Sequence, residues 1–571
     1  MSRSSRSSIC LTVALCAVLG ACTSTHYREA ADAETYAAIE EKTPLVPGMT
    51  AEVTLDPPAF ETTDEPVDLS GLAQNAQVFE FLDEQADSEV GARILGLNDA
   101  LGLAFAHSKE YQARKERLYL EALSLTFDRY RYTPTFSFSA SSDYEWDAED
   151  QFVADMQSLT GMQTINTGET LRARTSLGSR VLLMGGGVLA LTLNNNLTRF
   201  LTGNLGDTSG SSLLASFDQP LLRDFGTAVE AEALRQAERD LLYQLRDFTT
   251  YRKEFAVRIA SQYYSVLLAR ETARNNHSGL LAVNLSLERE QAFQAEGLRT
   301  LLQVGRLEQS ALQQDLRWAA SITRYKRALD NFKILIGLNA DDSIILDDNE
   351  MTLVMESGLS APLDLDIDQA VELALQTRLD LYTELDRVQD SARRVRVAVN
   401  ALAPALDLGI TVAVPGAGSD TGSELDFENA VYTAGLDLDL PLDNKAERNA
   451  YRRALIDYQA AIRDYQLAVD DVKLEVFDTW RRMDEARKRY EINLTSVAIN
   501  ERRVEEAELR AELGLGDIQD TVDSQDDLTA ARTNLVSAIV EHNIATLEFW
   551  RDVGLLYVDE NGQWEEGTDE P

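Results

Sequence analysis

The chain has 571 residues, a formal net charge of −42 and 26% charged residues. So acidic a surface would repel the phosphates of nucleic acid, which argues against nucleic acid as a partner. The charge suits an exposed, solvated surface or a lumen that favours cations, and the length allows several domains or one elongated domain.

The N-terminus has the pattern of a secretory signal. Arg3 and Arg6 form a positively charged start, and residues 9–19 form an apolar stretch too short to span a membrane as a mature helix. The stretch ends in a sequence that resembles a bacterial lipobox, Leu19-Gly20-Ala21-Cys22. We expect residues 1–21 to be removed as a lipoprotein signal peptide and the thiol of Cys22 to be acylated with a fatty acid such as palmitate. A plain secretory signal followed by a chance cysteine is the alternative.

The other two cysteines, Cys10 and Cys16, leave with this signal, so no intramolecular disulfide is expected. No Asp retention signal follows Cys22, which predicts sorting to the Gram-negative outer membrane. Residues 22–96 are polar and acidic and contain five prolines, so we expect a lipid-anchored extended arm. A helix is expected from about residue 97 to about residue 132.

Two copies of one arrangement of helices and strands follow the arm. Residues 97–111 match residues 367–381 at an offset of 270, and the same offset carries Pro134 onto Pro404. A second offset, of 217 residues, relates two pairs of Gly-Leu dipeptides: 297–298 with 514–515, and 337–338 with 554–555. This self-similarity predicts an internal two-fold structural repeat. The resulting divisions are a first repeat at 97–338, an equatorial linker at 339–366, a second repeat at 367–557 and an acidic tail at 558–571.

Period-two alternation predicts two strands in each repeat, at residues 134–147, 211–222, 404–415 and 431–442. The apolar face of the first and third strands comprises Phe136, Phe138, Ala140, Tyr144, Trp146, Leu406, Leu408, Ile410, Val412 and Val414. Such strands fit a soluble sheet with one wet face or a transmembrane barrel with a polar lumen. The lipobox, the long helices and the aspartates at lumen-type positions favour the barrel. Four strands leave unpaired edges in lipid, so the chain would have to oligomerise.

Each repeat ends in a long helical hairpin, at residues 224–337 and 443–554. In the second hairpin apolar and tyrosine side chains recur every seven residues, which indicates a coiled-coil contact. No Pro or Gly interrupts residues 443–513, so this helix is expected to reach roughly 107 Å at 1.5 Å per residue. In the first hairpin Arg252 interrupts the corresponding apolar series.

These features resemble the TolC-type outer-membrane efflux proteins, the lipoprotein branch especially, over about residues 97–557. The most specific are the duplicated plan, the Gly-Leu tips, Gln219-Pro220-Leu221-Leu222-Arg223 after the first strand pair and Leu440-Pro441-Leu442-Asp443 after the second. The resemblance implies an α+β membrane protein that forms a homotrimer. Four strands from each chain would close a 12-stranded outer-membrane β-barrel, which continues into a long periplasmic α-helical coiled-coil barrel.

The resemblance also implies a function. Members of the family are not enzymes but exit ducts of tripartite efflux pumps or type I secretion systems. A periplasmic adaptor (membrane fusion) protein joins them to an inner-membrane transporter. The alternative from another class is a lipid-anchored periplasmic coiled-coil scaffold without a pore.

The main departure from the family is an insertion at residues 148–210. Pro134 and Pro220 are 86 residues apart whereas Pro404 and Pro441 are 37 apart, so the first repeat carries 49 extra residues. The insertion contains Gly185-Gly186-Gly187 and then alternating leucines. We expect an extra hairpin outside the membrane as an extracellular extension, and two added barrel strands per chain are the alternative.

No catalytic or metal-binding constellation is apparent. The four histidines are scattered without metal-ligand spacing, and neither a phosphate-binding loop nor a nucleophile motif occurs. We therefore expect no enzymatic activity, no metal and no cofactor apart from the lipid on Cys22.

The candidate functional residues follow the helical tips. Asp517, Asp520 and Asp523 share one face of a helix start, where acids also suit the helix dipole. The resemblance maps a pore-facing pair onto Asp520 and Asp523, so that a trimer would place six carboxylates around one axis. It also makes the tips, Gly297-Leu298 and Gly514-Leu515, adaptor-docking sites, although simple turns are the alternative. Arg299 beside the first tip is a candidate closure contact between neighbouring hairpins, because acids lie beyond the second tip. Leu515-Gly516 stands where the family has Thr-Arg.

Overall fold

The computed structural model describes residues 24–49, 53, 55, 67–146, 169–201, 207–357, 359, 365–416, 424–513, 518–559 and 561–565. The predictions for the signal peptide, Cys22, Gly514, Leu515 and Asp517 lie outside the described residues. The chain divides into two compact units. The first contains the N-terminal segment up to Ala38, Glu121–Leu242 and Glu384–Asp464, and the second contains Ile39–Leu120, Tyr243–Thr383 and Tyr465–Pro571.

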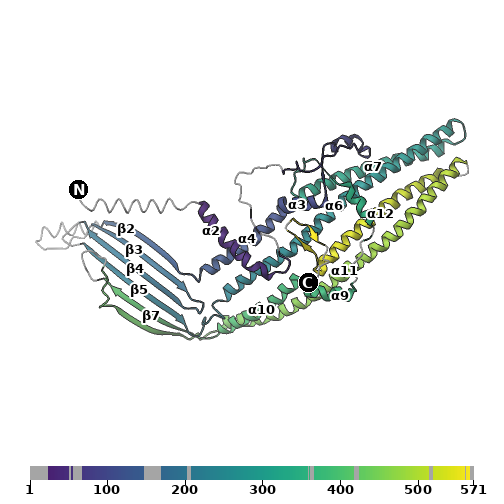
Figure 1. The fold of residues 1–571 in the computed structure, drawn as a ribbon. Coiled ribbons are helices and arrows are strands. Elements are labelled where there is room, and N and C mark those ends of the chain that lie inside the picture. Colours follow the sequence, from purple (N-terminus) through teal and green to yellow (C-terminus); the bar gives the residue numbers. More distant parts are fainter. Residues whose placement is uncertain are drawn as a thin grey trace, which may run out of the picture. The chain divides into compact units, whose positions relative to one another are not determined.

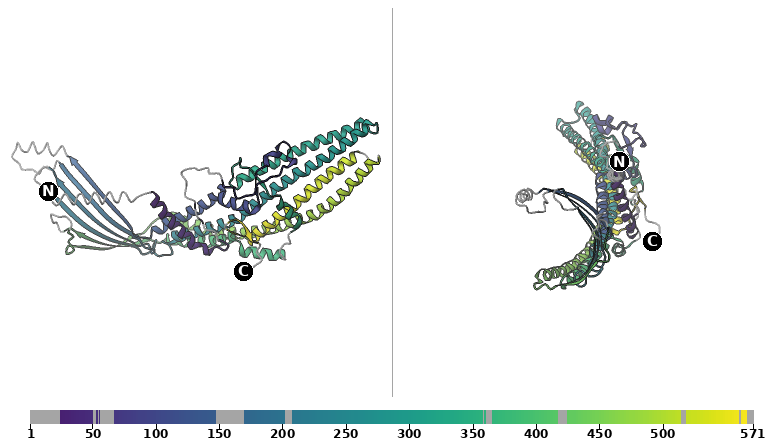
Figure 2. Two further views of the ribbon diagram at one scale, coloured as in Figure 1. Left: turned by 45° about the horizontal axis from the view of Figure 1, so that its top comes forward. Right: turned by 90° about the vertical axis from the view of Figure 1, so that its left-hand side faces the viewer.

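The first unit contains one antiparallel sheet of six strands, in the order β2-β3-β4-β5-β7-β8 (Figure 1). Its strands are β2 (Thr135–Trp146), β3 (Glu169–Leu182), β4 (Val188–Phe200), β5 (Thr208–Pro220), β7 (Ala405–Pro415) and β8 (Val431–Asp439). The sheet is a curved layer (Figure 2), and within the described part of this unit no helix packs on either of its faces.

Six strands correct the expectation of four strands per chain. The insertion does not form a separate extension, because β3 pairs with β2 from Glu169 to Arg180 and β4 pairs with β5 from Val188 to Thr198. The turn between β3 and β4 lies at the end of the sheet where strands join helices: the amide of Gly226, after β5, donates to the carbonyl of Gly185. The hairpin therefore runs the length of the sheet, as the alternative of two added strands requires.

The helical ends of the first unit are joined by buried charges. Glu232, at the start of α6 (Glu232–Ala295), accepts from Arg393 on α10 (Leu379–Asn400) at 2.8 Å. Arg393 also donates to Asp390 at 2.8 Å, and Arg239 donates to the same carboxylate at 2.8 Å. Since Glu232, Asp390 and Arg393 are all buried, removing one partner would leave an uncompensated charge. This network fixes α6 against α10 where both adjoin strands.

The arm is not extended throughout, which corrects a second expectation. Ser24–Lys42 forms helix α2, because its alanines and glutamates are strong helix formers and all five prolines lie beyond it. Further on, Arg93–Leu95 forms β1 and pairs in parallel with β6 (Ile344–Leu346). The buried carboxylate of Glu89 accepts from Lys326 at 2.8 Å and from Tyr325 at 3.0 Å. The end of the arm is thus part of the second unit.

Helices dominate the second unit. The helices not yet given, including those shared with the first unit, are α3 (Leu97–His107), α4 (Lys109–Tyr130), α7 (Leu301–Leu335), α8 (Asp348–Ser357), α9 (Ile367–Thr377), α11 (Lys445–Glu512) and α12 (Ile518–Val553). The bounds of α9 and α10 equal those of α3 and α4 plus 270 residues. Helix α7 begins with a capping box, in which Thr300 and Gln303 each satisfy a backbone amide of the other.

Two apolar clusters hold these helices together. Ala370 and Ala374 of α9 are fully buried against α11 and α12, where Val476 and Phe549 contact them. Near the tips, a second cluster joins α6, α7 and α12 through Val283, Leu307, Ala311 and Val522. None of the helices in the described ranges has the length and hydropathy needed to cross a bilayer.

Arg252 explains the interruption in the first apolar series. Its side chain is buried, and its guanidinium donates to the backbone carbonyls of Val558 at 3.1 Å and Asp559 at 2.8 Å. These residues belong to a small hairpin in which β9 (Tyr557–Val558) pairs with β10 (Trp564–Glu565). The start of the expected acidic tail is therefore folded against α6.

A substitution at Gly337 tests the packing between the end of α7 and the end of α3. Its φ is +88°, and an added Cβ would lie 2.3 Å from the carbonyl oxygen of His107. We expect Gly337→Ala to lower the free energy of unfolding by at least ~1–3 kcal/mol, because the left-handed backbone and the backbone contact both oppose a side chain. Thermal unfolding followed by helical circular dichroism measures the effect.

Gly305→Ala is the matched control. Gly305 lies inside α7 with open space around its Cβ position, so alanine should stabilise the chain by ~0.5–1 kcal/mol. Equal midpoints for the two variants would contradict the packing described for Gly337.

Candidate functional site

The first candidate site is the surface of the six-stranded sheet. Side chains of paired residues share a face, so the strand register assigns every position. One face carries most of the large apolar side chains of the sheet, with a polar row at Thr175, Asn195 and Ser211. On β2 and β8 its members include Phe136 and Tyr432, each 75% exposed. The inner strands continue it with Leu177, Leu189, Leu191, Leu193, Leu197, Leu213, Phe217, Ile410 and Val412. An exposed apolar face of this extent requires an apolar partner.

The opposite face is polar on all six strands. Near the loop end, Arg172 pairs with Glu145 at 2.6 Å and Arg174 with Asp143 at 3.2 Å, across β3 and β2. Between these pairs and the helical end the face presents mainly hydroxyl and amide groups. At the helical end it carries Asp218, Asp407, Asp437 and Asp439. The sheet therefore separates a mainly apolar surface from a polar, charged one.

The sheet ends in two open edges. β2 and β8 are its outer strands, and each is paired on one side only. Open edges present a row of backbone donors and acceptors that can pair with another chain. The described chain alone does not satisfy these groups by strand pairing.

The second candidate site is the tip of the first helical hairpin. Gly297 has a φ of +75°, and the amides of Gly297 and Leu298 donate to the last carbonyls of α6 at 2.9 Å, which closes the turn. Leu298 is 68% exposed, and Leu301 and Leu302 beside it are also exposed. The tip thus presents a small leucine surface, of which the sequence pattern predicted only Leu298.

Asp520 and Asp523 lie on the first turns of α12, and both are exposed. The side-chain amide of Gln519 donates to the carboxylate of Asp523 at 2.8 Å. The opposite side of these turns is buried, since Val522 packs against the first hairpin. The helix is therefore oriented by its apolar side, and the two carboxylates point away from the chain's own core.

Arg299 lies in a buried contact within the chain. Its Nε donates to Glu290 at 2.7 Å, and the side chains of Arg299 and Glu290 are 12% and 2% exposed. Its Nη2 lies 3.5 Å from the carbonyl of Ala511 near the end of α11. The proposed contact with a neighbouring hairpin stays a prediction, and it would require this ion pair to open.

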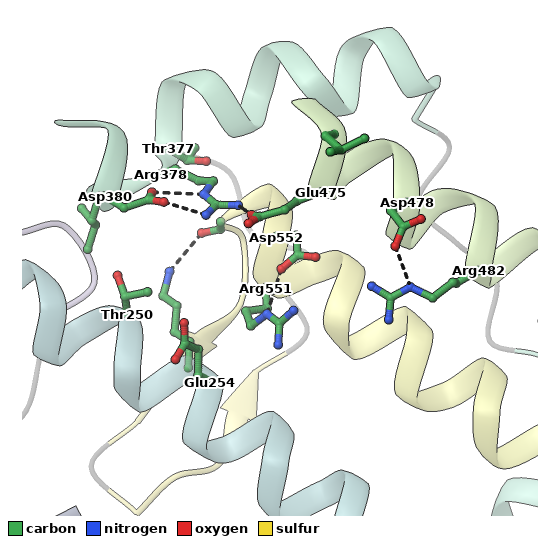
Figure 3. A pocket seen from close by; sticks show the side chains of 14 residues that line it. Thr250, Glu254, Thr377, Arg378, Asp380, Glu475, Asp478, Arg482, Arg551 and Asp552 are labelled. Carbon is green, nitrogen blue, oxygen red and sulfur yellow. Dashed lines mark hydrogen bonds and ion pairs between the residues drawn. The ribbon is translucent and has the colours of Figure 1, made fainter. Parts of the chain in front are cut away.

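A charged pocket of about 570 Å³ lies where α6, α9, α10, α11 and α12 meet (Figure 3). Arg378, at the end of α9, donates to Asp380 at 2.6 Å and contacts Glu475 on α11. Arg551 pairs with Asp552, and Lys253 donates to the carbonyl of Gly554 at 3.1 Å. Because its basic groups already have partners, the pocket acts as a charged joint between helices. No sequence motif marked these residues.

Comparison with solved structures identifies outer-membrane channels of the same fold. The outer membrane protein VceC from Vibrio cholerae is 17% identical and aligns over 80% of this chain and 96% of its own, with a TM-score of 0.57. The CmeC outer membrane channel of Campylobacter jejuni is 14% identical over 83% of this chain and 87% of its own, with a TM-score of 0.57. The MtrE outer membrane channel of Neisseria gonorrhoeae is 14% identical over 81% of this chain and 90% of its own, with a TM-score of 0.54. No family model matches the sequence, and no curated protein matches it.

These similarities confirm the expected resemblance at the level of the fold. The chain has the mixed helix-and-sheet fold of outer-membrane channel proteins. At such identities the comparison defines architecture, and the function has to be argued from the sites.

Lys253 provides a test of the charged pocket. Burial, assisted by the charge of Arg252, lowers the pKa of Lys253 to about 8 from its ordinary value of 10.5. Between about pH 8 and pH 10 the unfolded chain therefore binds more protons, so stability should rise with pH. From pH 7.5 to pH 9.5, the free energy of unfolding of the wild type should rise relative to that of Lys253→Met.

Measurements stay below pH 10 because burial raises the pKa of Tyr111 and of Tyr251 to about 12. These neutral phenols favour the folded state below pH 10, and that contribution is lost as the pH rises toward 12. Lys473→Met on α11 controls for the loss of one positive charge. Parallel pH curves for wild type and Lys253→Met would contradict the buried ammonium.

Arg299→Ala tests the intrachain ion pair. It would leave the carboxylate of Glu290 buried without its cation, which should cost ~3–5 kcal/mol of unfolding free energy. Adding Glu290→Gln should recover much of that loss, because the uncompensated charge is removed. Equal stabilities for the single and the double variant would show that the pair contributes little.

Proposed function

We propose that copies of this chain assemble into an outer-membrane exit duct. The observation that carries the proposal is the sheet, which is predominantly apolar and exposed on one face and predominantly polar on the other. A bilayer provides an apolar partner for the first face, and a water-filled lumen suits the second. In lipid every backbone group has to be paired, so the open edges of β2 and β8 require further copies.

The remaining parts of the proposal rest on the resemblance. A homotrimer closes the barrel, and the helical hairpins line a periplasmic conduit. A periplasmic adaptor binds the tips and recruits an inner-membrane transporter, within an efflux pump or a type I secretion system. The duct is a passage and not an enzyme, and its only attached group is the lipid on Cys22.

The competing function is a lipid-anchored periplasmic scaffold without a pore. It would use the helical hairpins, but it gives no role to a sheet whose apolar face is exposed. In water such a face would promote aggregation. The sheet therefore favours the duct.

Charge placed on alternate faces of β4 tests the proposal. Leu191 lies on the apolar face and is 47% exposed, whereas the next residue, Thr192, lies on the polar face. Leu191→Arg should weaken barrel folding by up to ~2–4 kcal/mol, because it places a guanidinium on the side of the sheet that faces lipid. Thr192→Arg, which adds the same group to the lumen, should be tolerated.

Insertion into lipid vesicles, followed by heat-modifiable migration in detergent gels, measures both variants. Conductance in planar bilayers then reports whether the inserted protein forms a pore. If the two variants insert equally well, the apolar face is not in contact with lipid and the proposed duct fails.

A second prediction concerns the aperture. In a trimer, Asp520 and Asp523 would supply six carboxylates around one axis, and such rings favour cations. Replacing both with Ala should lower cation selectivity and weaken block by multivalent cations. Reversal potentials in a salt gradient provide the measurement.

Asp527→Ala is the control, because Asp527 lies one turn further along α12 and already pairs with Arg503 at 2.7 Å. Removing that charge should leave selectivity nearly unchanged. If the double variant behaves like the control, Asp520 and Asp523 serve only the helix start.

A further inference from the structure

The hairpin of β3 and β4 is an integral part of the sheet. β3 is paired on both sides, with β2 and with β4, and β4 is paired on both sides, with β3 and with β5. One row of residues runs straight across these four strands: Ser139, Ser176, Asn194 and Ser212. The hairpin therefore separates β2 from β5 by two full strand widths.

The turn of this hairpin is fitted closely to the neighbouring backbone. An added Cβ on Gly186 would lie 2.6 Å from the carbonyl oxygen of Asp224, and one on Gly187 would lie 2.4 Å from the Gln219 side chain. The side-chain amide of Gln219 donates to the backbone carbonyl of Gly185 at 3.0 Å. Gly186 lets the turn dock where β5 leads toward α6, because a side chain there would collide with the backbone of Asp224. The turn is thus anchored to the base of the sheet.

The hairpin also leaves the rest of the sheet undisturbed. Two antiparallel strands preserve the alternation of direction, so β2 and β5 remain antiparallel to each other. They preserve the faces as well, since Phe138 pairs with Leu177, Leu177 with Leu193 and Leu193 with Leu213. An even number of strands per chain also sets the edge β8 antiparallel to the β2 of a following copy. The insertion widens the sheet by two strands and changes nothing else in its pattern.

From these observations we infer that the assembled barrel has eighteen strands, six from each of three copies, joined by pairing of β8 with β2 of the next copy. The inference rests on the proposed duct and its trimer. A strand spacing of ~4.8 Å and a tilt of ~40° give a backbone diameter of ~36 Å, against ~24 Å for twelve strands. The polar face that lines this lumen carries hydroxyl groups, amides and charges. The barrel therefore accommodates bulky hydrophilic solutes, and it is wider than the twelve-stranded barrel that the resemblance implies.

Three pairs of cysteines in the full-length protein distinguish the two barrels. Ser139→Cys with Ser176→Cys, and Asn194→Cys with Ser212→Cys, join neighbouring strands in the eighteen-stranded arrangement. Ser139→Cys with Ser212→Cys joins β2 to β5, which in the six-stranded sheet lie ~14 Å apart, too far for a disulfide. If the hairpin left the barrel, those two strands would become neighbours.

We expect the first two pairs to form disulfides in heat-stable, conducting oligomers and the third pair to remain reduced, as read by peptide mass spectrometry. A disulfide between residues 139 and 212 in conducting protein would overturn the eighteen-stranded barrel and leave the duct intact. Absence of conductance from wild-type protein inserted in bilayers would overturn the duct, and the barrel inference with it.

The width of the lumen has its own test. Deleting residues 169–200 removes β3, its turn and β4, and allows β2 to pair with β5. Neutral polymers of graded size, added on the loop side, lower conductance only if they enter the barrel. The polymer diameter that is just excluded should fall by at least about 1.5-fold in the deletion variant, because the backbone diameter scales with strand number and side chains narrow both lumens equally. The same cut-off for wild type and deletion would show that the hairpin does not line the lumen. If the deletion variant does not fold, the disulfide pattern decides.

Discussion

The two unpaired edges of the six-stranded sheet are the constraint on which this account depends. Sheet edges are tolerated in water when they are short or charged, but lipid offers their amides and carbonyls no partner. The apolar face of this sheet suits lipid, and the edges of a single chain do not. Assembly of several copies resolves the conflict, because it pairs the edges and encloses the polar face. On this account the membrane-spanning part exists only as an oligomer, and its stability depends on the concentration of the chain.

The alternation of side chains was sufficient to place β2, β7 and β8, because each strand carries at least four apolar positions on one face and turn residues at its ends. The hairpin of β3 and β4 has the same alternation, and yet its location was predicted wrongly. Alternation shows that a strand has two faces but not which strands lie beside it. The deciding contacts link residues far apart in sequence, such as Gly185 with Gly226. Long-range pairing of this kind cannot be inferred from local patterns.

In the helical unit, the partners of single residues were likewise not predictable from the sequence. Arg252 was visible as an interruption of an apolar series, but its partners lie about 300 residues further along the chain. Arg299 was predicted from its position beside a tip, and the structure gives it a partner, Glu290, across the turn. Charges at helix ends are easily located in a sequence. Whether they face solvent, another chain or a buried carboxylate depends on packing, which sequence spacing does not determine.

The most direct measurement of the central claim is a cysteine-accessibility scan along β4 in the assembled, membrane-inserted protein. Single cysteines would replace consecutive residues from Leu189 to Leu197, and a water-soluble, membrane-impermeant maleimide would report which thiols face water. We predict strict alternation: labelling at Ala190, Thr192, Asn194 and Asn196, and protection at Leu189, Leu191, Leu193, Asn195 and Leu197. Uniform labelling along the strand would contradict the account, because it would place both faces of the sheet in water.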